Sequence, residues 1–323
     1  MMVYEFNSNF AESLTKFVEQ KKSLGFQYDG YIKYLKRFDR LCSEKFPLET
    51  QLTREISEVW ATKSPTENTN TLRNRIFLLR EFAKFLIRSG FEAHILPSDL
   101  VKRPARYRPY IYSKDDVSKI WSEFDNLREI KKYPTRQIIL SALVRVFYCC
   151  GLRPIEARRL RVSDVDLQIG RFFIRESKGC KDRIVMLADD VTEYLREYDR
   201  KITVISGKRE WFFPGPNGGF CPCSWINDNF FQICRKLGIC TINGKVPRMY
   251  DLRHTMATHR LYEWMKLGIN LNEKIQYLSR YLGHAQLSDT YYYIHLVPEQ
   301  LQSISGYDLS KYENLLPEVI YDE

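Results

Sequence analysis

The stretch LSRYLGHAQLSDTYYYIHL, residues 278–296, contains a Gly-His turn at Gly283 and His284, followed by three tyrosines at positions 291–293. Upstream, YDLRH at residues 250–254 places Arg253 at the start of a helical pattern. A tyrosine phenol near His and Arg can attack a phosphodiester, because positioned neighbours activate a weak hydroxyl nucleophile. Tyrosines near the end of a chain are also common packing residues, and the stretch taken alone favours packing.

Length and charge favour a soluble protein with a polyanionic partner. At 323 residues the chain is long for a single core, which predicts two domains. The formal net charge is +10. Residues 301–323 hold five acids and one lysine, a charge of −4, so the first 300 residues carry +14. Such a balance is typical of nucleic-acid-binding proteins, although many basic proteins bind no nucleic acid.

Several other classes of protein lack support in the sequence. The first residues show no basic segment followed by an apolar core, and no apolar run approaches the ~20 residues of a membrane span. The eight cysteines include no CxxC pair, and no phosphate-binding P-loop motif occurs. We therefore expect a cytoplasmic protein with reduced cysteines, no membrane contact, no bound metal and no cofactor.

Residues 1–100 are predicted to be a helical domain. Ser8 is expected to cap the first helix, and the fourth helix is expected to run from about Asn68 to Ser89. One side of the fourth helix carries a row of cations. A solvated face and a phosphate-contacting face both explain such a row. Its members are Arg73, Arg75, Arg80, Lys84 and Arg88.

Residues 101–112 are predicted to form an extended linker between two domains. Prolines and cations alternate here, a composition suited to a connector that lies along a DNA backbone. A plain connector has no need of four cations within seven positions. The cations are Lys102, Arg103, Arg106 and Arg108.

Residues 113–300 are predicted to form a second domain, which opens with a capping box at Ser113 and is centred on an apolar helix over residues 138–150. After that helix, GLRPIE at residues 151–156 places Arg153 at a helix junction, with Pro154 in the first turn of the next helix. Glu156 can brace Arg153, although a purely structural ion pair is a common alternative. Two β runs, 172–174 and 183–187, enclose a turn that carries Lys178, which is either solvated or a proton donor.

Four motifs in this order resemble the catalytic domain of tyrosine recombinases, the phage-integrase and Xer-like family. They are GLRPIEARRLRVSDVD (151–166), KGCKDRIVML (178–187), YDLRHTMATH (250–259) and YLGHAQLSDTYYYIHL (281–296). An ordered set is far more specific than any single short motif. The helical first domain and the basic linker are similar to the family's core-binding domain and its connection. The resemblance implies a mainly α fold with a small β-sheet: a helical core-binding domain that clamps DNA and a mixed helical catalytic domain.

The resemblance also implies roles for individual residues. Arg153 and Arg253 match the arginines that hold the scissile phosphate, and Lys178 matches the hairpin lysine that protonates the leaving 5′ oxygen. His284 matches the histidine that bonds the phosphate or the nucleophile. The family's nucleophilic tyrosine lies nine positions after that histidine, which is Tyr293 here. Glu156 matches an acidic position that supports the first arginine.

Two features of these motifs leave questions open. The family commonly has histidine three residues before the second arginine, and this chain has Tyr250. A tyrosine donates a hydrogen bond to a phosphate oxygen but is no cation at neutral pH, so the acid–base duty of this position is in doubt. Tyr292, beside the expected nucleophile, is the main competitor for its role.

The resemblance implies site-specific cutting and rejoining of double-stranded DNA through a 3′-phosphotyrosyl intermediate, without a metal. Two guanidiniums can bind the extra negative charge of a pentavalent phosphate, and a lysine proton assists departure of the alkoxide. The family implies a homotetramer, or a hetero-tetramer with related recombinases, on two DNA sites, with residues 301–323 docking on a neighbouring protomer. A nicking-resealing enzyme like a type IB topoisomerase and a non-catalytic DNA-binding protein remain as alternatives.

Overall fold

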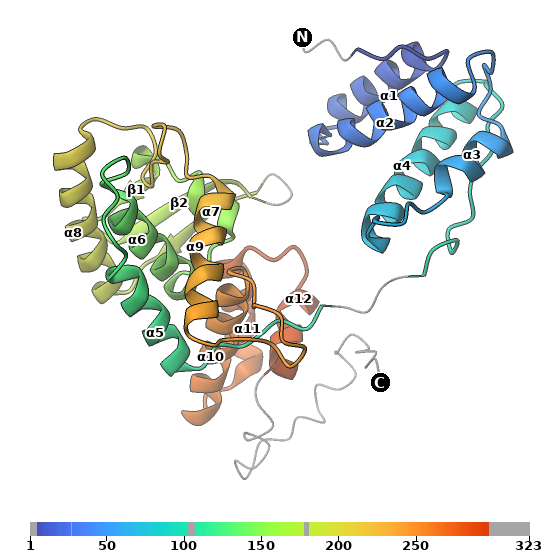
Figure 1. Ribbon diagram of the computed structural model, residues 1–323. Helices are drawn as coiled ribbons and strands as arrows, with labels where there is room; N and C mark the ends of the chain where they lie inside the picture. Colours follow the sequence, from blue (N-terminus) through green and yellow to red (C-terminus); the bar gives the residue numbers. More distant parts are fainter. Residues whose placement is uncertain (1–4, 27, 103–106, 178–180, 297–323) are drawn as a thin grey trace. The chain divides into compact units, whose positions relative to one another are not determined.

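The computed structural model describes residues 5–26, 28–102, 107–177 and 181–296. These residues form two compact units, and the second unit begins at Tyr107 (Figure 1). Each unit has its own hydrophobic core. Lys178, Arg103, Arg106 and the predicted docking tail 301–323 lie outside the described residues.

The first unit is helical, with a core rich in aromatic residues. Phe17, Phe38 and Phe82 are completely or almost completely buried. The ring of Phe82 lies within 6.1 Å of the centroids of both other rings, in tilted or edge-on contacts that aromatic pairs favour. The helices are α1 (Ala11–Ser23), α2 (Asp29–Lys45), α3 (Arg54–Ala61) and α4 (Thr69–Arg88).

The expected cap at Ser8 is wrong, because a distant carboxylate binds this serine. The Ser8 hydroxyl donates to Asp39 Oδ1 at 2.6 Å, and the Ser8 amide donates to the same oxygen at 2.9 Å. Helix α1 begins at Ala11, without a side-chain cap. In contrast, Asn68 caps α4 as the sequence predicts, since its side chain accepts from the Asn70 amide at 2.8 Å.

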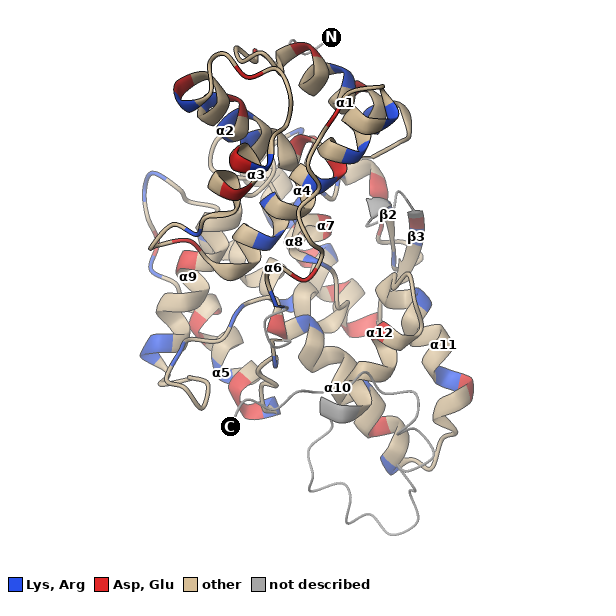
Figure 2. Ribbon diagram, turned by 90° about the vertical axis from the view of Figure 1, so that its right-hand side faces the viewer, with Lys and Arg blue, Asp and Glu red and all other residues tan. Residues whose placement is uncertain are grey.

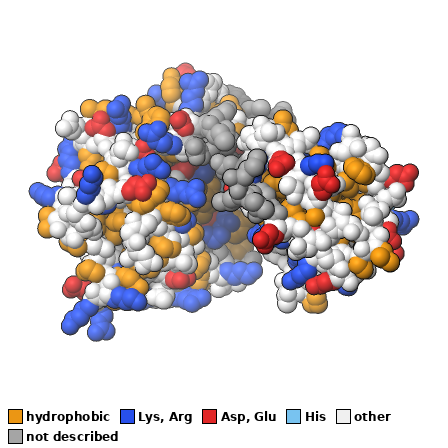
Figure 3. Space-filling view, turned by 90° about the horizontal axis from the view of Figure 1, so that it is seen from above, with side chains coloured by type: hydrophobic (Ala, Val, Ile, Leu, Met, Phe, Trp, Pro, Cys, Tyr) orange, Lys and Arg blue, Asp and Glu red, His pale blue; other side chains and the backbone are white. Residues whose placement is uncertain are grey.

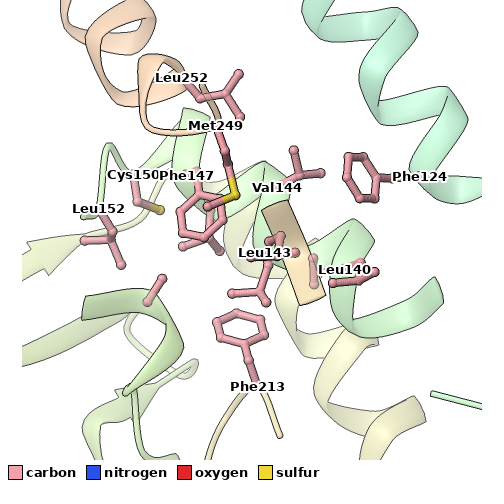
Figure 4. Packing of buried hydrophobic residues seen from close by; sticks show 14 of the residues in the cluster. Phe124, Leu140, Leu143, Val144, Phe147, Cys150, Leu152, Phe213, Met249 and Leu252 are labelled. Atoms are coloured by element: carbon pink, nitrogen blue, oxygen red, sulfur yellow. The ribbon is translucent and has the colours of Figure 1, made fainter. Parts of the chain in front are cut away.

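The second unit contains most of the described helices and the described strands. Helix α6 is buried along most of its length and is packed by α5, α8 and α10. Figure 4 shows Met249, just before α10, and Leu252, its second residue, close to Phe147 and Cys150 at the end of α6. The helices are α5 (Lys114–Asp125), α6 (Arg136–Cys149), α7 (Pro154–Arg158), α8 (Asp189–Ser206), α9 (Cys223–Lys236), α10 (Asp251–Lys266), α11 (Leu271–Leu282), α12 (Ser288–Tyr291) and the 3-10 turns η1 (Val162–Asp164) and η2 (Tyr292–Leu296).

The described strands form one antiparallel sheet in the order β1-β2-β3. They are β1 (Val165–Asp166), β2 (Arg171–Ser177) and β3 (Lys181–Met186). In β2 and β3, Phe172 pairs with Val185 and both are buried, while Ile184 on the other face of β3 is half exposed. This alternation is expected for a sheet covered on one face. The predicted fold class, mainly helical with a small sheet, is confirmed.

Local signals set most boundaries in this unit. Ser113 and Asp116 form the predicted capping box in front of α5, and Pro154 occupies the first turn of α7. Residues 107–112, expected to be linker, instead pack on the second unit, and Tyr112 is completely buried. Helix α9 begins at Cys223 without a side-chain cap. None of the described helices is both long and apolar enough to cross a membrane.

Candidate active site

Three arginines that are distant in sequence meet at the C-terminal end of α11. Arg183 donates to the carbonyl of Tyr281 at 2.9 Å, and Arg253 to that of Leu282 at 2.6 Å. Arg153 donates to the next carbonyl, that of Gly283, at 2.7 Å. The last carbonyls of a helix have no partner within the helix and carry its negative dipole end, so they attract cations. This helix end therefore holds three guanidiniums together.

Gly283 makes this arrangement possible. Its backbone is left-handed, with φ +68° and ψ 48°, a conformation that ends α11 and directs the chain to His284. A Cβ at this position would lie 2.9 Å from Nη1 of Arg183. Gly151, before Arg153, is similar: its φ is +57°, and a Cβ would lie 2.8 Å from Cε of Met256. Both turns require glycine because the backbone conformation and the space exclude a side chain.

Glu156 links two of the arginines. Its carboxylate accepts from the Arg153 amide at 2.9 Å and from Nη1 of Arg153 at 2.7 Å. It also accepts from Nη1 and Nη2 of Arg183, at 2.9 and 2.8 Å. Its side chain is 3% exposed, so these are nearly desolvated, charge-assisted contacts. The ion pair that the sequence predicts between Arg153 and Glu156 is present.

Arg183 is the residue that the sequence analysis missed. Its signal lies in the strand pattern, because residues two apart in a strand face the same side. Val185 is buried, so alternation also places the Arg183 side chain on the inner face of β3. An inward-facing arginine in an apolar strand needs a buried acidic partner, and Glu156 supplies it.

Arg253 is the most deeply buried of the three arginines, with 1% of its surface exposed. It is the third residue of α10. Besides its bond to Leu282, it donates from Nη1 to the carbonyl of Gly151 at 2.6 Å. Its Nε is buried and has no hydrogen-bond partner among the described residues. A buried donor without a partner is costly, and an anionic ligand at this point would satisfy it.

Tyr293 lies against the arginine cluster. It is 2% exposed, and its ring stacks on that of His284 with centroids 5.8 Å apart. Burial raises the pKa of Tyr293 to about 12, although the charges of Arg253 and Arg153 act in the opposite direction. The phenol is therefore protonated at neutral pH in this state. A bound negative charge on the arginines would further disfavour the phenolate, so attack requires proton removal as the bond forms.

The other two tyrosines of the triplet lie elsewhere. The Tyr292 hydroxyl donates to the carbonyl of Tyr107 at 3.3 Å, and the ring is buried in the cluster formed by α10, α11 and η2. Tyr291 is half-buried at the end of α12. The geometry thus supports the register in which Tyr293, and not Tyr292, accompanies the arginines.

His284 is held as a neutral imidazole. Its Nδ1 lies 2.7 Å from the hydroxyl of Thr290, which is completely buried. Burial lowers the pKa of His284 to about 3, and the positive charges of Arg253 and Arg153 lower it further. In the tautomer whose Nδ1–H donates to Thr290, the other ring nitrogen, Nε2, can accept a proton. Phosphate binding would offset the arginine charges and raise this pKa.

Tyr250, which stands where histidine is common, lies next to this group. It precedes the first residue of α10, and its ring meets that of His254 edge-on, with centroids 5.1 Å apart. The ring of His254 in turn lies 5.5 Å from that of Tyr293. His254 is therefore a neighbour of the candidate nucleophile.

The site has an excess of positive charge. Arg153, Arg183 and Arg253 contribute three charges and Glu156 removes one, while His284 is neutral. A net charge of about +2 in a buried site suits a phosphodiester, and more so a transition state with a second negative charge. In the part of the chain that the structure covers, no group of three or more His, Cys, Asp or Glu side chains is arranged to hold a metal ion.

The predicted DNA-contacting residues differ in their exposure. Lys102 and Arg108 are exposed, Arg73 and Arg80 are half-buried, and Lys84 pairs with Glu81 at 2.9 Å. Lys and Arg residues recur along the helices of the first unit (Figure 2). On the face of the second unit seen at the left of Figure 3, basic side chains are more numerous than acidic ones.

The prediction that Arg75 contacts DNA is wrong, because its side chain is 2% exposed. It donates to Glu67 Oε1 at 2.7 Å and to the carbonyls of Trp60 and Thr62. Successive helix residues differ by about 100° around the axis, so Arg75 lies about 200° from Arg73. Arg80 and Lys84, in contrast, lie within about 20° of Arg73. Arg75 therefore faces the core of the first unit.

Comparison with known proteins places this site in a family. The family model described as the phage integrase family matches residues 113–300. A tyrosine recombinase of Pseudothermotoga lettingae is 30% identical over 234 residues, covering 72% of this chain and 73% of that protein. A putative integrase/recombinase, y4rB, of Sinorhizobium fredii is 26% identical over 307 residues, covering 91% of this chain and 95% of that protein.

Solved structures share the fold at low sequence identity. XerH recombinase bound to palindromic difH, in a post-cleavage complex, superposes with a TM-score of 0.61 at 18% identity, covering 84% of this chain and 77% of that chain. The Tn1549 transposon integrase in complex with transposon right end DNA gives a TM-score of 0.60 at 14% identity, covering 94% of this chain and 99% of that chain.

Proposed function

The chain belongs to the phage integrase family and is a tyrosine-type site-specific recombinase, and from that premise we propose how its residues cut and rejoin DNA. Tyr293 is the nucleophile, and Arg153 and Arg253 bind the scissile phosphate. The relatives that carry the name integrase or recombinase support the reaction class. The assignment of individual roles rests on the geometry of this site.

The two arginines act by binding charge that increases during the reaction. Each already donates to a carbonyl of the α11 end, so its position is fixed before DNA arrives. The phosphodiester carries one negative charge, and the pentavalent transition state carries about two. A site with a net charge of about +2 therefore stabilises the transition state more than the ground state, which is the requirement for catalysis.

In the first step, the Tyr293 oxygen forms a bond to phosphorus while the bond from phosphorus to the 5′ oxygen breaks. The phenol loses its proton, and the departing 5′ oxygen gains one. The product is a 3′-phosphotyrosyl bond and a free 5′ hydroxyl. In the second step a 5′ hydroxyl attacks this phosphorus, and Tyr293 leaves and regains its proton. Both steps conserve the number of phosphodiester bonds, so neither requires ATP.

Two groups carry the protons in this proposal. His284 accepts the phenol proton, since it is neutral and its ring lies against that of Tyr293. Lys178 supplies the proton to the 5′ oxygen, an assignment from its motif because this residue lies outside the described part of the chain. Such proton transfers typically contribute 10²–10⁴ in rate. Tyr250 donates a hydrogen bond to a phosphate oxygen.

The first unit is proposed to clamp the DNA with phosphate contacts from Arg73, Arg80 and Lys102, and Arg108 is proposed to add a phosphate contact from the start of the second unit. The assembly proposed is a homotetramer, or a hetero-tetramer with related recombinases, on two double-stranded DNA sites. The XerH recombinase structure contains a palindromic difH substrate, and the Tn1549 integrase structure contains transposon right end DNA. Nothing in the proposal requires a metal or a cofactor.

The observation that carries the proposal is the buried Nε of Arg253, which has no hydrogen-bond partner in the described structure and lies in the same site as Tyr293. Such a donor is costly in a folded protein without a ligand. A phosphate oxygen next to Tyr293 would accept from it, which places the phosphorus within reach of the phenol.

A suicide substrate tests the proposal. A duplex site would be selected from a random-sequence pool by binding to the full chain and then nicked close to the cleavage point. We expect a protein–DNA adduct that resists SDS for wild type and for Tyr292→Phe, and none for Tyr293→Phe. Loss of the adduct in Tyr292→Phe alone would show that the register is wrong. Tight binding without any adduct from wild type would favour the non-catalytic alternative.

A further inference from the structure

The segment that opens the second unit, residues 107–112, is fastened to the helix that carries Arg253. The Tyr107 hydroxyl donates to Asp251 Oδ2 at 2.7 Å, and Asp251 is completely buried. At the other end of the segment, the Tyr112 amide donates to the hydroxyl of Thr255 at 3.1 Å. Asp251 and Thr255 lie on α10, two residues on either side of Arg253.

Arg248 closes the contact around Tyr107. Its guanidinium carbon lies 3.3 Å from the centroid of the Tyr107 ring, and its Nη2 donates to Asp251 Oδ1 at 3.0 Å. The carboxylate of Asp251 thus accepts from the tyrosine and from the arginine that covers its ring. Charge-assisted bonds to a buried carboxylate are among the stronger hydrogen bonds in proteins. This cluster fixes the point at which the chain enters the second unit.

The same residue also meets the nucleophile segment. The backbone carbonyl of Tyr107 accepts from the hydroxyl of Tyr292 at 3.3 Å. Tyr292 is 6% exposed and directly precedes Tyr293. Tyr107 therefore touches α10 through its side chain and the tyrosine triplet through its backbone, from a position 185 residues earlier in the chain than Tyr292.

We propose that Tyr107 is a positioning residue for DNA cleavage, which couples the entry point of the chain to the nucleophile through Asp251 and Tyr292. The proposal rests on the proposed role of Tyr293. Neither bond touches the reacting atoms, so the link acts only on where Tyr293 sits relative to Arg253. A displacement of about 1 Å from the reactive geometry can cost ~10²-fold in rate, so a modest shift here suffices to slow cleavage.

The two bonds can be removed separately. Tyr107→Phe deletes the bond to Asp251 and leaves the backbone carbonyl that Tyr292 uses. Tyr292→Phe deletes the other bond and leaves the ring in its pocket. Tyr110→Phe is a matched control, because this phenol lies in the same segment but donates to Asp116 at 3.4 Å, away from α10 and Tyr292.

The test measures three quantities on the full chain with the selected, nicked duplex: the single-turnover cleavage rate, the dissociation constant for the duplex, and the melting temperature. We expect Tyr107→Phe and Tyr292→Phe each to slow cleavage roughly three- to tenfold, the range of one hydrogen bond. The dissociation constant should stay near wild type, and both variants should remain folded at an assay temperature well below their melting temperatures. Because either change breaks the same link, the double variant should be no slower than the slower single variant.

The outcomes separate this inference from the assignment of the nucleophile. Wild-type cleavage that Tyr293→Phe abolishes, together with unchanged rates in both variants, would overturn the positioning role alone. Equal slowing by Tyr110→Phe, multiplicative slowing in the double variant, or losses that follow the melting temperature would also overturn it. Complete loss of the adduct in Tyr292→Phe would instead contradict the assignment of Tyr293.

Discussion

Replacing Glu156 by glutamine should destabilise the second unit and slow cleavage together. The carboxylate accepts three side-chain hydrogen bonds from Arg153 and Arg183 and one from the Arg153 amide. The amide group of glutamine has the same shape, but its NH₂ would face N–H donors, and the site would hold three guanidiniums without a counter-charge. Removing one partner from a buried ion pair costs about 3–5 kcal/mol.

Glutamine keeps one acceptor oxygen, so we expect the lower end of this range, about 3 kcal/mol in the free energy of unfolding. Cleavage should fall on the order of 10²-fold, because Arg153 loses the bond that orients it. Urea denaturation and single-turnover cleavage, under conditions where the variant stays folded, measure the two effects.

Glu263→Gln is the matched control for this change. Glu263 pairs with Lys114 at 3.1 Å on the surface, with 39% of its side chain exposed. Exposed pairs contribute about 0–1 kcal/mol, so this variant should resemble wild type in both assays. If Glu156→Gln lowered the free energy of unfolding by no more than the control and cleaved at the wild-type rate, the proposed brace would be refuted.

Three further predictions follow from single contacts. Arg75→Gln should lower the free energy of unfolding of the first unit by about 3–5 kcal/mol, whereas Arg73→Gln should leave that free energy unchanged. Arg73→Gln should instead reduce the slope of the logarithm of the DNA-binding constant against log [salt] by about one. An equal salt effect from both variants would contradict the assignment. Gly283→Ala should destabilise and inactivate the protein, because φ is +68° and the new Cβ would meet Arg183. Gly238→Ala is the control: its φ is +69° but no atom lies near the new Cβ, so the free energy of unfolding should fall by only about 1–2 kcal/mol and activity should be retained. The pKa of His284 is lowered from 6.5 to about 3, so this residue should bind fewer protons in the folded than in the unfolded protein. The free energy of unfolding should therefore decrease as the pH is lowered from 6.5, by about 2 kcal/mol at pH 5. His284→Gln should remove this decrease, and a variant with the same pH profile as wild type would refute the prediction.

The sequence predicted the elements whose signals are local. Ser113 caps α5 and Asn68 caps α4 because each side chain bonds to an amide within three residues. Ser8 has the same chemistry, but it binds Asp39, 31 residues away, and no local pattern contains that contact. Arg75 differs from Ser8, because helical spacing is a local signal and already places Arg75 on the side opposite Arg73.

The candidate site could be predicted as a set of residues but not as an arrangement. The motifs pointed to Arg153, Arg253, His284 and Tyr293, and the structure brings these four together. The sequence did not indicate that three successive carbonyls of α11 hold three arginines, because that contact depends on how α7, α10 and β3 pack around one helix end. Arg183 was missed for this reason.

The most direct test of the central claim identifies the atom that becomes bonded to DNA. The covalent adduct from the suicide substrate would be digested with nuclease and trypsin, and the peptide carrying the nucleotide remnant would be fragmented in a mass spectrometer. Residues 281–311 form one tryptic peptide that contains all three tyrosines of the triplet, so the fragment ions must distinguish them. We predict the remnant on Tyr293; a remnant on Tyr291 or Tyr292, or on a residue outside this peptide, would contradict the account.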